Sequence, residues 1–287
     1  MRVGVVGLIP REPGCIDAAA TARVVELGFS GVSVMLGDPG AALADQLEAV
    51  REVLSAAGIN VAQANGAYPS LVDPDPRVRR AGIDGLVAHM QSAKLLGAAT
   101  LYVRPGGLNA GGPWWPHPDH HRREPFERLI DSLQQVAAAA ETAGVTLALE
   151  GHALSVLDTP ERAGELLRRV GSLALGFNLD PVNFIGSVWD AWRPQRVYDR
   201  LLHEAGPRVV VAHWKDYRVE NRLVLHVTEV VPGTGLVDHA RWLRELHAVQ
   251  PDAWVLIEHL PPDQIPAAKQ ALDAALAAAG LEWQGGP

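Results

Sequence analysis

The sequence has few of the features that mark secreted or membrane proteins. Cys15 is the single cysteine, so no intrachain disulfide can form, which fits a reducing cytoplasm. No apolar run approaches the roughly 20 residues that span a bilayer, so no membrane contact is expected. The opening MRVGVVGLIP runs straight into Pro10 and indicates a first β-strand rather than a signal peptide. We therefore expect a cytoplasmic protein.

Positive charge is also scarce. The 25 Lys and Arg residues are outnumbered by 33 Asp and Glu residues, which gives a formal net charge of −8. An acidic surface repels phosphate backbones, so nucleic acid is not an expected partner. A Gly-rich phosphate loop is missing as well, because Gly4 and Gly7 lie inside the first apolar run and Pro10 follows it. This argues against a dinucleotide-binding fold.

What the chain does have is a repeated pattern over its 287 residues. A short β-branched run, a polar or Gly-rich loop and an Ala/Leu-rich helical stretch alternate, and a glycine suited to a helix C-terminus often follows. The pattern predicts an α/β fold, a (β/α)8 TIM barrel formed as one domain by residues 1–287. An open doubly wound sheet is the main alternative, but it usually has fewer strands. The junction glycines are Gly28, Gly58, Gly97, Gly144 and Gly171, and the predicted strands cover 2–7, 30–36, 59–65, 99–104, 145–150, 173–180, 208–213 and 253–258.

Three of the predicted strand-to-helix loops are long. They run over about 104–125, 180–194 and 213–237. Long loops that follow strand C-termini usually build the active site of a barrel enzyme.

The last four predicted strands each end on a residue type that binds metals: Glu150, Asp180, His213 and Glu258. Taken singly, such a carboxylate is ordinarily a helix cap or a solvated loop residue. Consecutive strands of a closed barrel are neighbours, so these four side chains are expected to converge at its mouth. Three carboxylates and one imidazole suit one divalent ion, with Mn²⁺, Co²⁺ and Mg²⁺ as the leading candidates and Zn²⁺ as an alternative.

Strand periodicity adds candidates for substrate binding. His152 should face the same way as Glu150, and Lys215 the same way as His213. Lys215 could hold a carboxylate, phosphate or oxyanion, or else form a salt bridge to Asp216. Arg104 at a strand end is a candidate anion or hydroxyl contact.

Other candidates lie in the long loops. Trp114 and Trp115 could stack on a sugar face or else plug the barrel rim. His226, a reserve metal ligand, and Glu229 could face the site from a hairpin after the seventh strand. A His-rich patch is read as a solvated loop, with a second metal as the alternative; it comprises His117, His120 and His121.

Several segments together resemble the xylose isomerase-like barrels of sugar isomerases and epimerases, a group that includes inosose dehydratase and endonuclease IV. The segments are LALEGH, FNLDPVN, AHWKD, VPGTG and LIEHL, between residues 147 and 260. In the ketose 3-epimerases of this group a Glu, an Asp, a His and a Glu hold one metal. The resemblance implies that role for Glu150, Asp180, His213 and Glu258, and implies proton transfer by the two glutamates through an enediolate. It also implies a homodimer or homotetramer.

The sequence departs from two branches of this group. The endonuclease branch adds histidines where this chain has Asn65 and Arg104, so a three-metal cluster is not expected and these two become substrate-binding candidates. Ketose 3-epimerases place a substrate-contacting His three residues after the Asp ligand, where this chain has Asn183. The turn that often reads Gly-Glu-Gly has Thr234 at its centre. Both changes concern the substrate rather than the metal.

These observations predict a metal-dependent isomerase or epimerase of a small sugar-like or keto-sugar molecule. The alternative is a lyase or dehydratase of the same fold, acting on an inosose-, dehydroshikimate- or 3-keto-glycoside-type substrate, because the same four ligands serve either reaction. A third class, a sugar-binding barrel without catalysis, is disfavoured by the complete ligand set.

Overall fold

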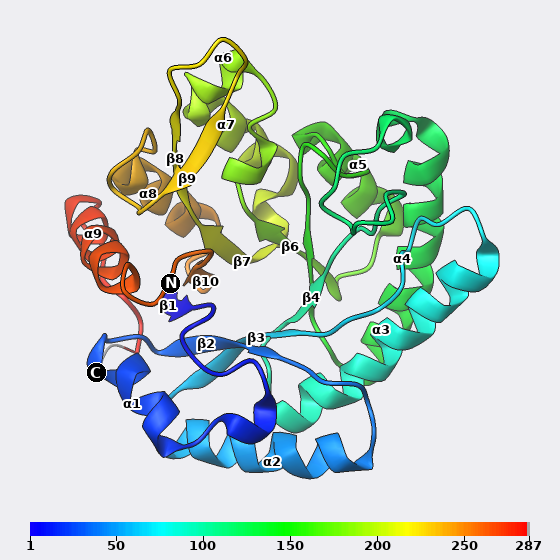
Figure 1. Cartoon of the computed structure of the whole chain (residues 1–287), viewed down its shortest axis with the longest axis horizontal. Helices are drawn as coiled ribbons and strands as arrows, with labels where there is room; N and C mark the ends of the chain where they lie inside the picture. The colour runs from blue at the N-terminus through cyan, green and yellow to red at the C-terminus, as the bar shows by residue number, and fades with distance from the viewer. Residues whose placement is uncertain (286–287) are drawn as a thin grey trace.

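Eight short strands pair in parallel and close into a barrel, in a computed structural model that describes residues 1–285 (Figure 1). Each strand pairs with its neighbour along the chain, and the last closes against the first through the register Arg2 with Trp254 and Val5 with Ile257. The predicted (β/α)8 fold class is therefore confirmed. The barrel strands are β1 (Arg2–Val5), β2 (Gly31–Met35), β3 (Asn60–Asn65), β4 (Leu101–Val103), β5 (Leu147–Glu150), β6 (Leu175–Leu179), β7 (Val209–Trp214) and β10 (Trp254–Ile257).

Helices surround the barrel and cover the outer face of the strands (Figure 1). The α-helices are α1 (Ala18–Glu26), α2 (Ala41–Ala56), α3 (Pro76–Leu96), α4 (Arg123–Ala143), α5 (Pro160–Val170), α6 (Val188–Ala191), α7 (Pro194–Ala205), α8 (His239–Val249) and α9 (Ile265–Ala278). Short 3₁₀ turns are η1 (Pro13–Cys15), η2 (Pro118–His121), η3 (Val182–Phe184) and η4 (Gly206–Arg208). Among the helices that the structure describes, none combines the length and the apolar character of a membrane span.

The five junction glycines have the conformation that the sequence predicts. Their φ angles lie between 66° and 73°, in the left-handed region that glycine enters without steric cost. Gly97, Gly144 and Gly171 cap α3, α4 and α5 directly, which turns the chain sharply back into the next strand. These five turns lead into β2, β3, β4, β5 and β6, and all eight barrel strands run parallel, so that their C-terminal ends meet at one mouth.

Apolar side chains fill the barrel below that mouth. Trp254 and Leu256 of β10 pack with Ala148 and Val211, and all four are at most 2% exposed. A Cβ on Gly31 would overlap the Trp254 ring, so this glycine makes room for the indole. The packed floor leaves the C-terminal mouth as the place for polar side chains.

The loop after β7 forms the predicted hairpin. β8 (Asp216–Val219) and β9 (Val227–Val230) pair antiparallel as a two-stranded sheet separate from the barrel sheet. The hairpin rises beside α6 at the top of the view in Figure 1. Tyr217 anchors it there, because its hydroxyl donates to Ala191 O of α6 at 2.7 Å.

Candidate metal centre at the barrel mouth

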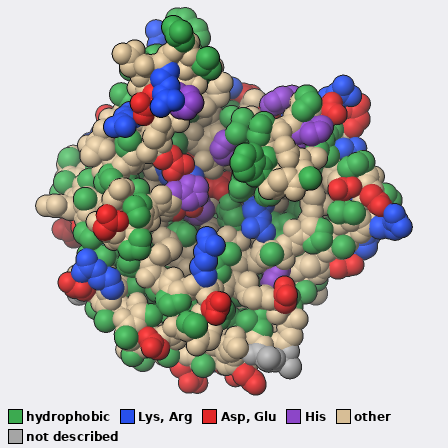
Figure 2. All heavy atoms as spheres, in the orientation of Figure 1, with side chains coloured by type: hydrophobic (Ala, Val, Ile, Leu, Met, Phe, Trp, Pro, Cys, Tyr) green, Lys and Arg blue, Asp and Glu red, His purple; other side chains and the backbone are tan. Residues whose placement is uncertain are grey.

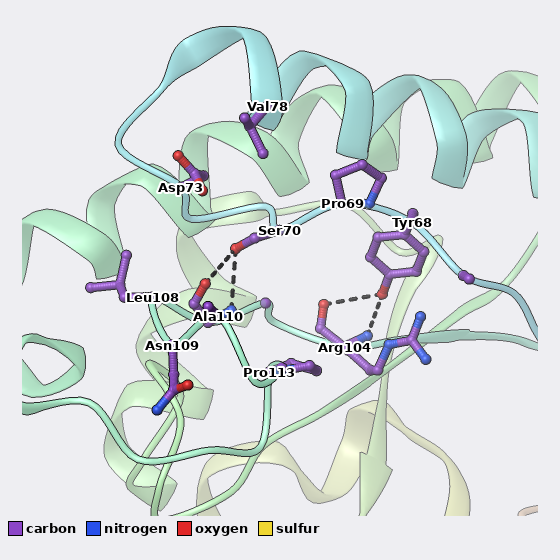
Figure 3. Close-up of a pocket in the computed structure, with 14 residues that line it drawn as sticks. Tyr68, Pro69, Ser70, Asp73, Val78, Arg104, Leu108, Asn109, Ala110 and Pro113 are labelled. Atoms are coloured by element: carbon purple, nitrogen blue, oxygen red, sulfur yellow. Dashed lines mark hydrogen bonds between the residues drawn. The ribbon is translucent and has the colours of Figure 1, made fainter.

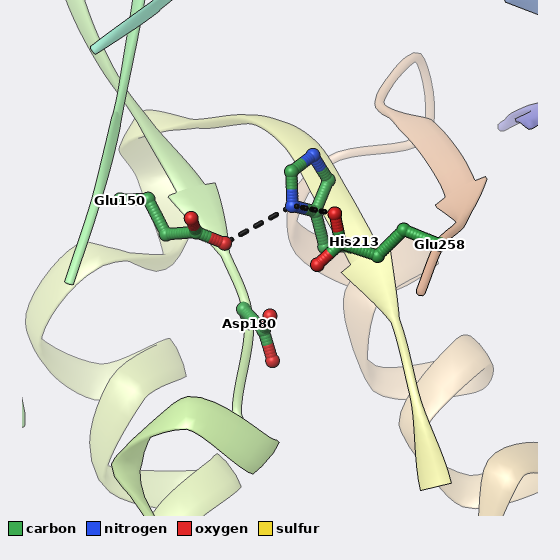
Figure 4. Close-up of side chains that lie close together, drawn as sticks. All are labelled: Glu150, Asp180, His213 and Glu258. Carbon is green, nitrogen blue, oxygen red and sulfur yellow. Dashed lines mark hydrogen bonds and ion pairs between the residues drawn. The ribbon is translucent and has the colours of Figure 1, made fainter. Parts of the chain in front are cut away.

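Four side chains that the sequence singled out meet at the C-terminal ends of four neighbouring strands (Figure 4). Glu150 ends β5, Asp180 follows β6, His213 lies in β7, and Glu258 follows β10. One ligand atom from each lies within 4.8 Å of the others. All four residues are nearly buried, between 0% and 7% exposed. We call these four residues the ligand cluster.

The imidazole of His213 lies between the two glutamates. Its Nδ1 is 3.0 Å from Glu150 Oε1 and 3.1 Å from Glu258 Oε2. Burial alone would lower the pKa of His213, but Glu258 and Glu150 outweigh it and raise the pKa to about 10. Burial, with the two glutamates as like charges, raises the pKa of Asp180 to about 7 against the pull of Lys215. Three buried carboxylates so close together therefore favour the binding of positive charge.

Lys215 supplies part of that charge. Its Nζ lies 2.8 Å from Asp180 Oδ2 and 2.8 Å from Glu258 Oε1, and it donates to Asn183 Oδ1 at 3.0 Å. Burial opposes the ammonium form, but these carboxylates raise the pKa of Lys215 well above its usual range. Lys215 thus faces the same way as His213, as predicted, and the alternative of a salt bridge to Asp216 is wrong. Asn183 joins the same group of side chains.

The donor set fits a divalent cation. Three carboxylates and one imidazole are ligands that Mg²⁺, Mn²⁺, Co²⁺ and Zn²⁺ accept. The charges also balance, because a 2+ ion and the Lys215 ammonium together offset three carboxylates. The ligand cluster could therefore hold one metal ion.

Three buried polar residues that the sequence reasoning missed support the cluster from below. Tyr102 donates its hydroxyl to Glu150 Oε2, and Asn178 Nδ2 donates to Glu150 Oε1 at 3.2 Å. Gln63 Oε1 lies 3.2 Å from His213 Nε2. Burial, and then Glu150 and Glu258, raise the pKa of Tyr102 well above its usual range, so the phenol stays protonated and donates. These contacts orient Glu150 and His213 toward one point.

The rings of His152 and Trp114 lie against each other. Their ring centroids are 5.8 Å apart, and His152 Nδ1 accepts the Leu154 N–H at 3.0 Å. Burial and the nearby Lys215 lower the pKa of His152 to about 4, so its imidazole is neutral. The adjacent Trp115 differs from Trp114, because 59% of its surface is exposed to solvent.

Asn65 and Arg104 lie outside the ligand cluster but contact each other. Arg104 Nη1 donates to Asn65 Oδ1 at 3.4 Å, and Nη2 donates to Gly66 O at 2.6 Å. The guanidinium also covers the Tyr68 ring, 4.9 Å from its centroid. Arg104 therefore extends the polar surface toward β3 and β4.

The hairpin brings one of its two predicted residues, Glu229, close to Lys215. Glu229 Oε1 is 3.8 Å from Lys215 Nζ, and both Glu229 oxygens are 3.3 Å from His259 Nδ1. His259, which the sequence reasoning missed, has a φ of 59°, unusual for a residue with a side chain. His226 is exposed near the outer end of the hairpin and is not a member of the cluster.

The His-rich patch is engaged in structural contacts. His120 is buried, with Nε2 accepting the Leu108 N–H at 2.8 Å and Nδ1 2.7 Å from Leu154 O. His121 pairs with Asp158 at 2.5 Å, and His117 accepts the Asp119 N–H at 3.2 Å. These contacts favour a structural role over a second metal, and the prediction of a solvated loop is wrong for His120, which is buried.

Seen from outside, the mouth is a hollow. Figure 2 shows acidic, basic and histidine side chains gathered in it, with hydrophobic side chains on its rim. This distribution suits a polar ligand that enters between apolar walls.

The chain is similar to known proteins over nearly its full length. A model of the xylose isomerase-like TIM barrel family matches residues 21–282. A search among curated proteins gave no match.

Solved structures share the fold at low sequence identity. One is a xylose isomerase-like TIM barrel protein from Mycobacterium smegmatis in complex with magnesium, with a TM-score of 0.73 and 19% identity over 97% of this chain and 96% of that chain. A second is 3-keto-D-glucoside 4-epimerase from E. coli, with a TM-score of 0.70 and 17% identity over 96% of this chain and 98% of that chain. A third is D-psicose 3-epimerase from Clostridium cellulolyticum H10 with D-tagatose, with a TM-score of 0.73 and 15% identity over 97% of this chain and 99% of that chain.

Proposed function

The chain belongs to the xylose isomerase-like TIM barrel family, and on that premise we propose that it is a metal-dependent isomerase or epimerase of a sugar or keto-sugar. One observation carries the proposal. Glu150 and Glu258 approach His213 Nδ1 from two sides, at 3.0 and 3.1 Å, so two carboxylates flank one point in a buried polar mouth (Figure 4). Flanking carboxylates are what removal and return of a proton on two faces of one carbon requires.

Different residues of the chain would have different roles in this reaction. When bound, a divalent cation supplies Lewis-acid chemistry that polarises a carbonyl and acidifies the adjacent C–H bond. One of Glu150 and Glu258 removes that proton, and the other returns a proton from the opposite side. Tyr102 and Asn178 fix the carboxylate of Glu150 for this role. Lys215, whose three N–H groups face Asp180, Glu258 and Asn183, would supply positive charge beside Glu258.

A lyase or dehydratase is the second candidate. The Lys215 ammonium lies 2.8 Å from Glu258, beside the carboxylate that would remove a proton. An ammonium at that place can stabilise a departing hydroxyl or alkoxide, which would turn proton removal into elimination. Product mass separates the two reactions, because an isomerase gives an isobaric product and a lyase does not.

Glu-to-Gln variants test the proposal. We expect Glu150→Gln and Glu258→Gln each to lower turnover by at least 10³-fold, since the amide cannot accept the proton, while circular dichroism shows the barrel intact. Exchange of substrate C–H for deuterium in D₂O, followed by NMR on Mn²⁺- or Mg²⁺-loaded protein with a panel of ketoses and keto-sugars, is the measurement. Glu161→Gln, on the exposed first turn of α5, is the matched control. Full activity in both active-site variants would overturn the proposal.

We further propose that residues 1–287 work as one domain on a small sugar-like molecule, and that His152, Asn183, Arg104 and Glu229 contact it.

A further inference from the structure

The loop at the tip of the β8–β9 hairpin has an unusual composition. Such loops usually consist of glycine and small polar residues, which suit tight turns and contact with water. Here residues 220–226 read ENRLVLH, with three apolar side chains in succession. Leu223 and Val224 are 108% and 77% exposed, and Leu225 is 38% exposed. The fold of a single chain therefore leaves this apolar tip in water.

A second group of exposed apolar side chains lies on α6 and at its end. Val188, Trp189 and Trp192 are 53%, 67% and 60% exposed. The two tryptophans are three residues apart, so both lie on one face of the helix. The guanidinium of Arg193 lies over the Trp189 ring, 4.8 Å from its centroid, yet most of the indole stays exposed. The helix thus presents two large aromatic rings to solvent.

The hairpin and α6 belong to one surface. Tyr217 of β8 donates to Ala191 O of α6 at 2.7 Å, and Leu223 follows Tyr217 by six residues. Six extended residues span about 20 Å, so the tip cannot lie farther than that from this hydrogen bond. Figure 1 shows the hairpin and α6 projecting together from the rim, and Figure 2 shows hydrophobic side chains on that projection. We call the exposed apolar residues of this projection the rim patch: Val188, Trp189, Trp192, Leu223, Val224 and Leu225.

The rim patch is large for a chain that works alone. Covering an aromatic side chain completely buries about 150–250 Å², so the six side chains at their exposed fractions offer on the order of 700 Å². The largest apolar patch on a typical monomer covers about 300–600 Å². A standard protein interface buries about 800 Å² on each partner. The rim patch therefore has the size of one side of a stable interface.

Shape and charge favour a second copy of this chain as the partner. The rim patch combines a protruding tip with the two rings of α6. A twofold axis between two copies would place the tip of each on α6 of the other, which buries both apolar groups in one closed contact. An anionic lipid surface is disfavoured, because the chain carries a net charge of −8.

We propose that the chain forms a symmetric homodimer through the rim patch, in which the hairpin tip of each copy packs on Trp189 and Trp192 of the other copy. The inference goes beyond the proposed function and does not depend on it. The same hairpin carries Glu229, whose Oε1 lies 3.8 Å from Lys215 Nζ, so the dimer contact would connect to the barrel mouth.

Analytical ultracentrifugation of the full chain over a range of concentrations tests the proposal. At micromolar concentration we expect a mass twice the 30.7 kDa of one chain. Leu223→Glu and Trp189→Lys place a charge in the contact from its two sides, and each should raise the dimer Kd at least about 30-fold, the scale of an interface hot spot. Leu173→Glu is the matched control and should leave the dimer unchanged, because Leu173 is 85% exposed before β6, at the end of the barrel away from the mouth.

A mixture of the two rim variants tests the pairing of tip with helix. In a mixed dimer, one contact joins an unmodified tip to an unmodified α6. The other contact joins the introduced carboxylate to the introduced ammonium, which attract each other. We therefore expect the mixture of Leu223→Glu and Trp189→Lys to form dimers at a concentration where each variant alone is monomeric. Circular dichroism of each variant checks that the barrel is intact.

Several outcomes would overturn the inference. An unmodified chain that stays monomeric at every concentration excludes the dimer, and binding of that monomer to phosphatidylcholine vesicles through the rim patch would assign the patch to a lipid surface. A dimer that neither rim variant weakens, or that Leu173→Glu weakens equally, would place the interface elsewhere. If both rim variants weaken the dimer but their mixture does not restore it, the tip does not pack on α6 and the proposed pairing is wrong.

Discussion

At the residue scale, the polar side chains under the ligand cluster determine the orientation of the His213 ring. The amide oxygen of Gln63 only accepts hydrogen bonds, so a protonated Nε2 of His213 can donate to it across 3.2 Å. The other nitrogen, Nδ1, is then directed at the two glutamates. A metal ion in the cluster would take Nδ1 as its ligand, with Gln63 fixing the ring behind it.

Removing Gln63 should therefore weaken metal binding more than it weakens the fold. We expect Gln63→Leu to lower the affinity for Mn²⁺ by about 10- to 100-fold, since partners of ligating histidines typically contribute that much. Calorimetric titration of Mn²⁺ measures it. Thr100→Val is the matched control. It removes a buried 2.8 Å hydrogen bond to Ala62 O at the end of β4 that lies away from the mouth. Unchanged affinity in Gln63→Leu would contradict this role.

The sequence predicts the four residues of the ligand cluster, but it does not predict the three polar residues that contact them. Each ligand residue ends an apolar run, so its position at a strand end can be recognised in the sequence. Gln63, Tyr102 and Asn178 lie inside such runs, where a polar residue is usually interpreted as an exposed strand position. Each precedes a residue already singled out by two positions, namely Asn65, Arg104 and Asp180, and period-two alternation puts such pairs on one face. That spacing is the signal that could have found them.

At the element scale, one carboxylate anchors the β8–β9 hairpin. Asp216 is fully buried, and both of its oxygens accept backbone N–H groups at 2.8–3.1 Å. These donors come from Tyr217 and from the turn between 233 and 237, and His239 adds a contact at 3.2 Å. The hairpin, and with it Glu229 beside Lys215, is thereby fixed over the mouth.

Asp216→Asn should loosen the hairpin. The new NH₂ group would face backbone donors, so we expect unfolding to become easier by roughly 2 kcal/mol or more. Chemical denaturation measures the loss, and limited proteolysis should show faster cleavage between 216 and 237. Glu220→Gln on the same hairpin removes an exposed pair with Arg218 and should leave both measurements near the unmodified chain. Equal proteolysis of the two variants would contradict the anchoring role.

A second element, the long loop after β4, depends on the neutral form of His120. Burial lowers the pKa of His120, and its two ring nitrogens bridge Leu108 N–H and Leu154 O. The unfolded chain takes up the proton first, near pH 6.5. The stability that neutral His120 contributes is therefore complete above that pH and is lost as the pH falls toward the lower folded-state value.

Thermal midpoints between pH 7.5 and 5 test this dependence. His120→Gln cannot titrate, so its midpoint should fall less steeply with acid than that of the unmodified chain. The exposed His203→Gln on α7 is the control and should keep the original slope. Identical slopes for all three proteins would show that His120 does not link the loop to pH. The sequence could not reveal this bridge, because its partners are backbone atoms 12 and 34 residues away.

At the scale of the whole molecule, the pattern of strands, helices and junction glycines was enough to predict the barrel. Local rules suffice here, because each glycine turn and each apolar run acts within a few residues. The cavity between the loop after β3 and the loop after β4, residues 67–73 and 104–113 (Figure 3), depends instead on contacts such as Ser70 with Gly107, across 37 residues. Which loops meet, and what space they leave, follows from packing that no local pattern encodes.

The whole molecule should also respond to the ion that its mouth could hold. An ion that binds the folded chain alone stabilises it by about 2.7 kcal/mol at 100 times its Kd, which for a chain of this size raises the thermal midpoint by several degrees. We therefore expect saturating Mn²⁺, Co²⁺ or Mg²⁺ to raise the midpoint of EDTA-treated protein. Because the net charge is −8, any salt can act by screening, so KCl at equal ionic strength is the control. Asp180→Asn should abolish the metal-specific part, since it removes one ligand and leaves the surface charge almost unchanged. If none of these three ions, nor Zn²⁺, shifts the midpoint beyond KCl, the four converging side chains do not form a metal site, and the proposed chemistry fails with it.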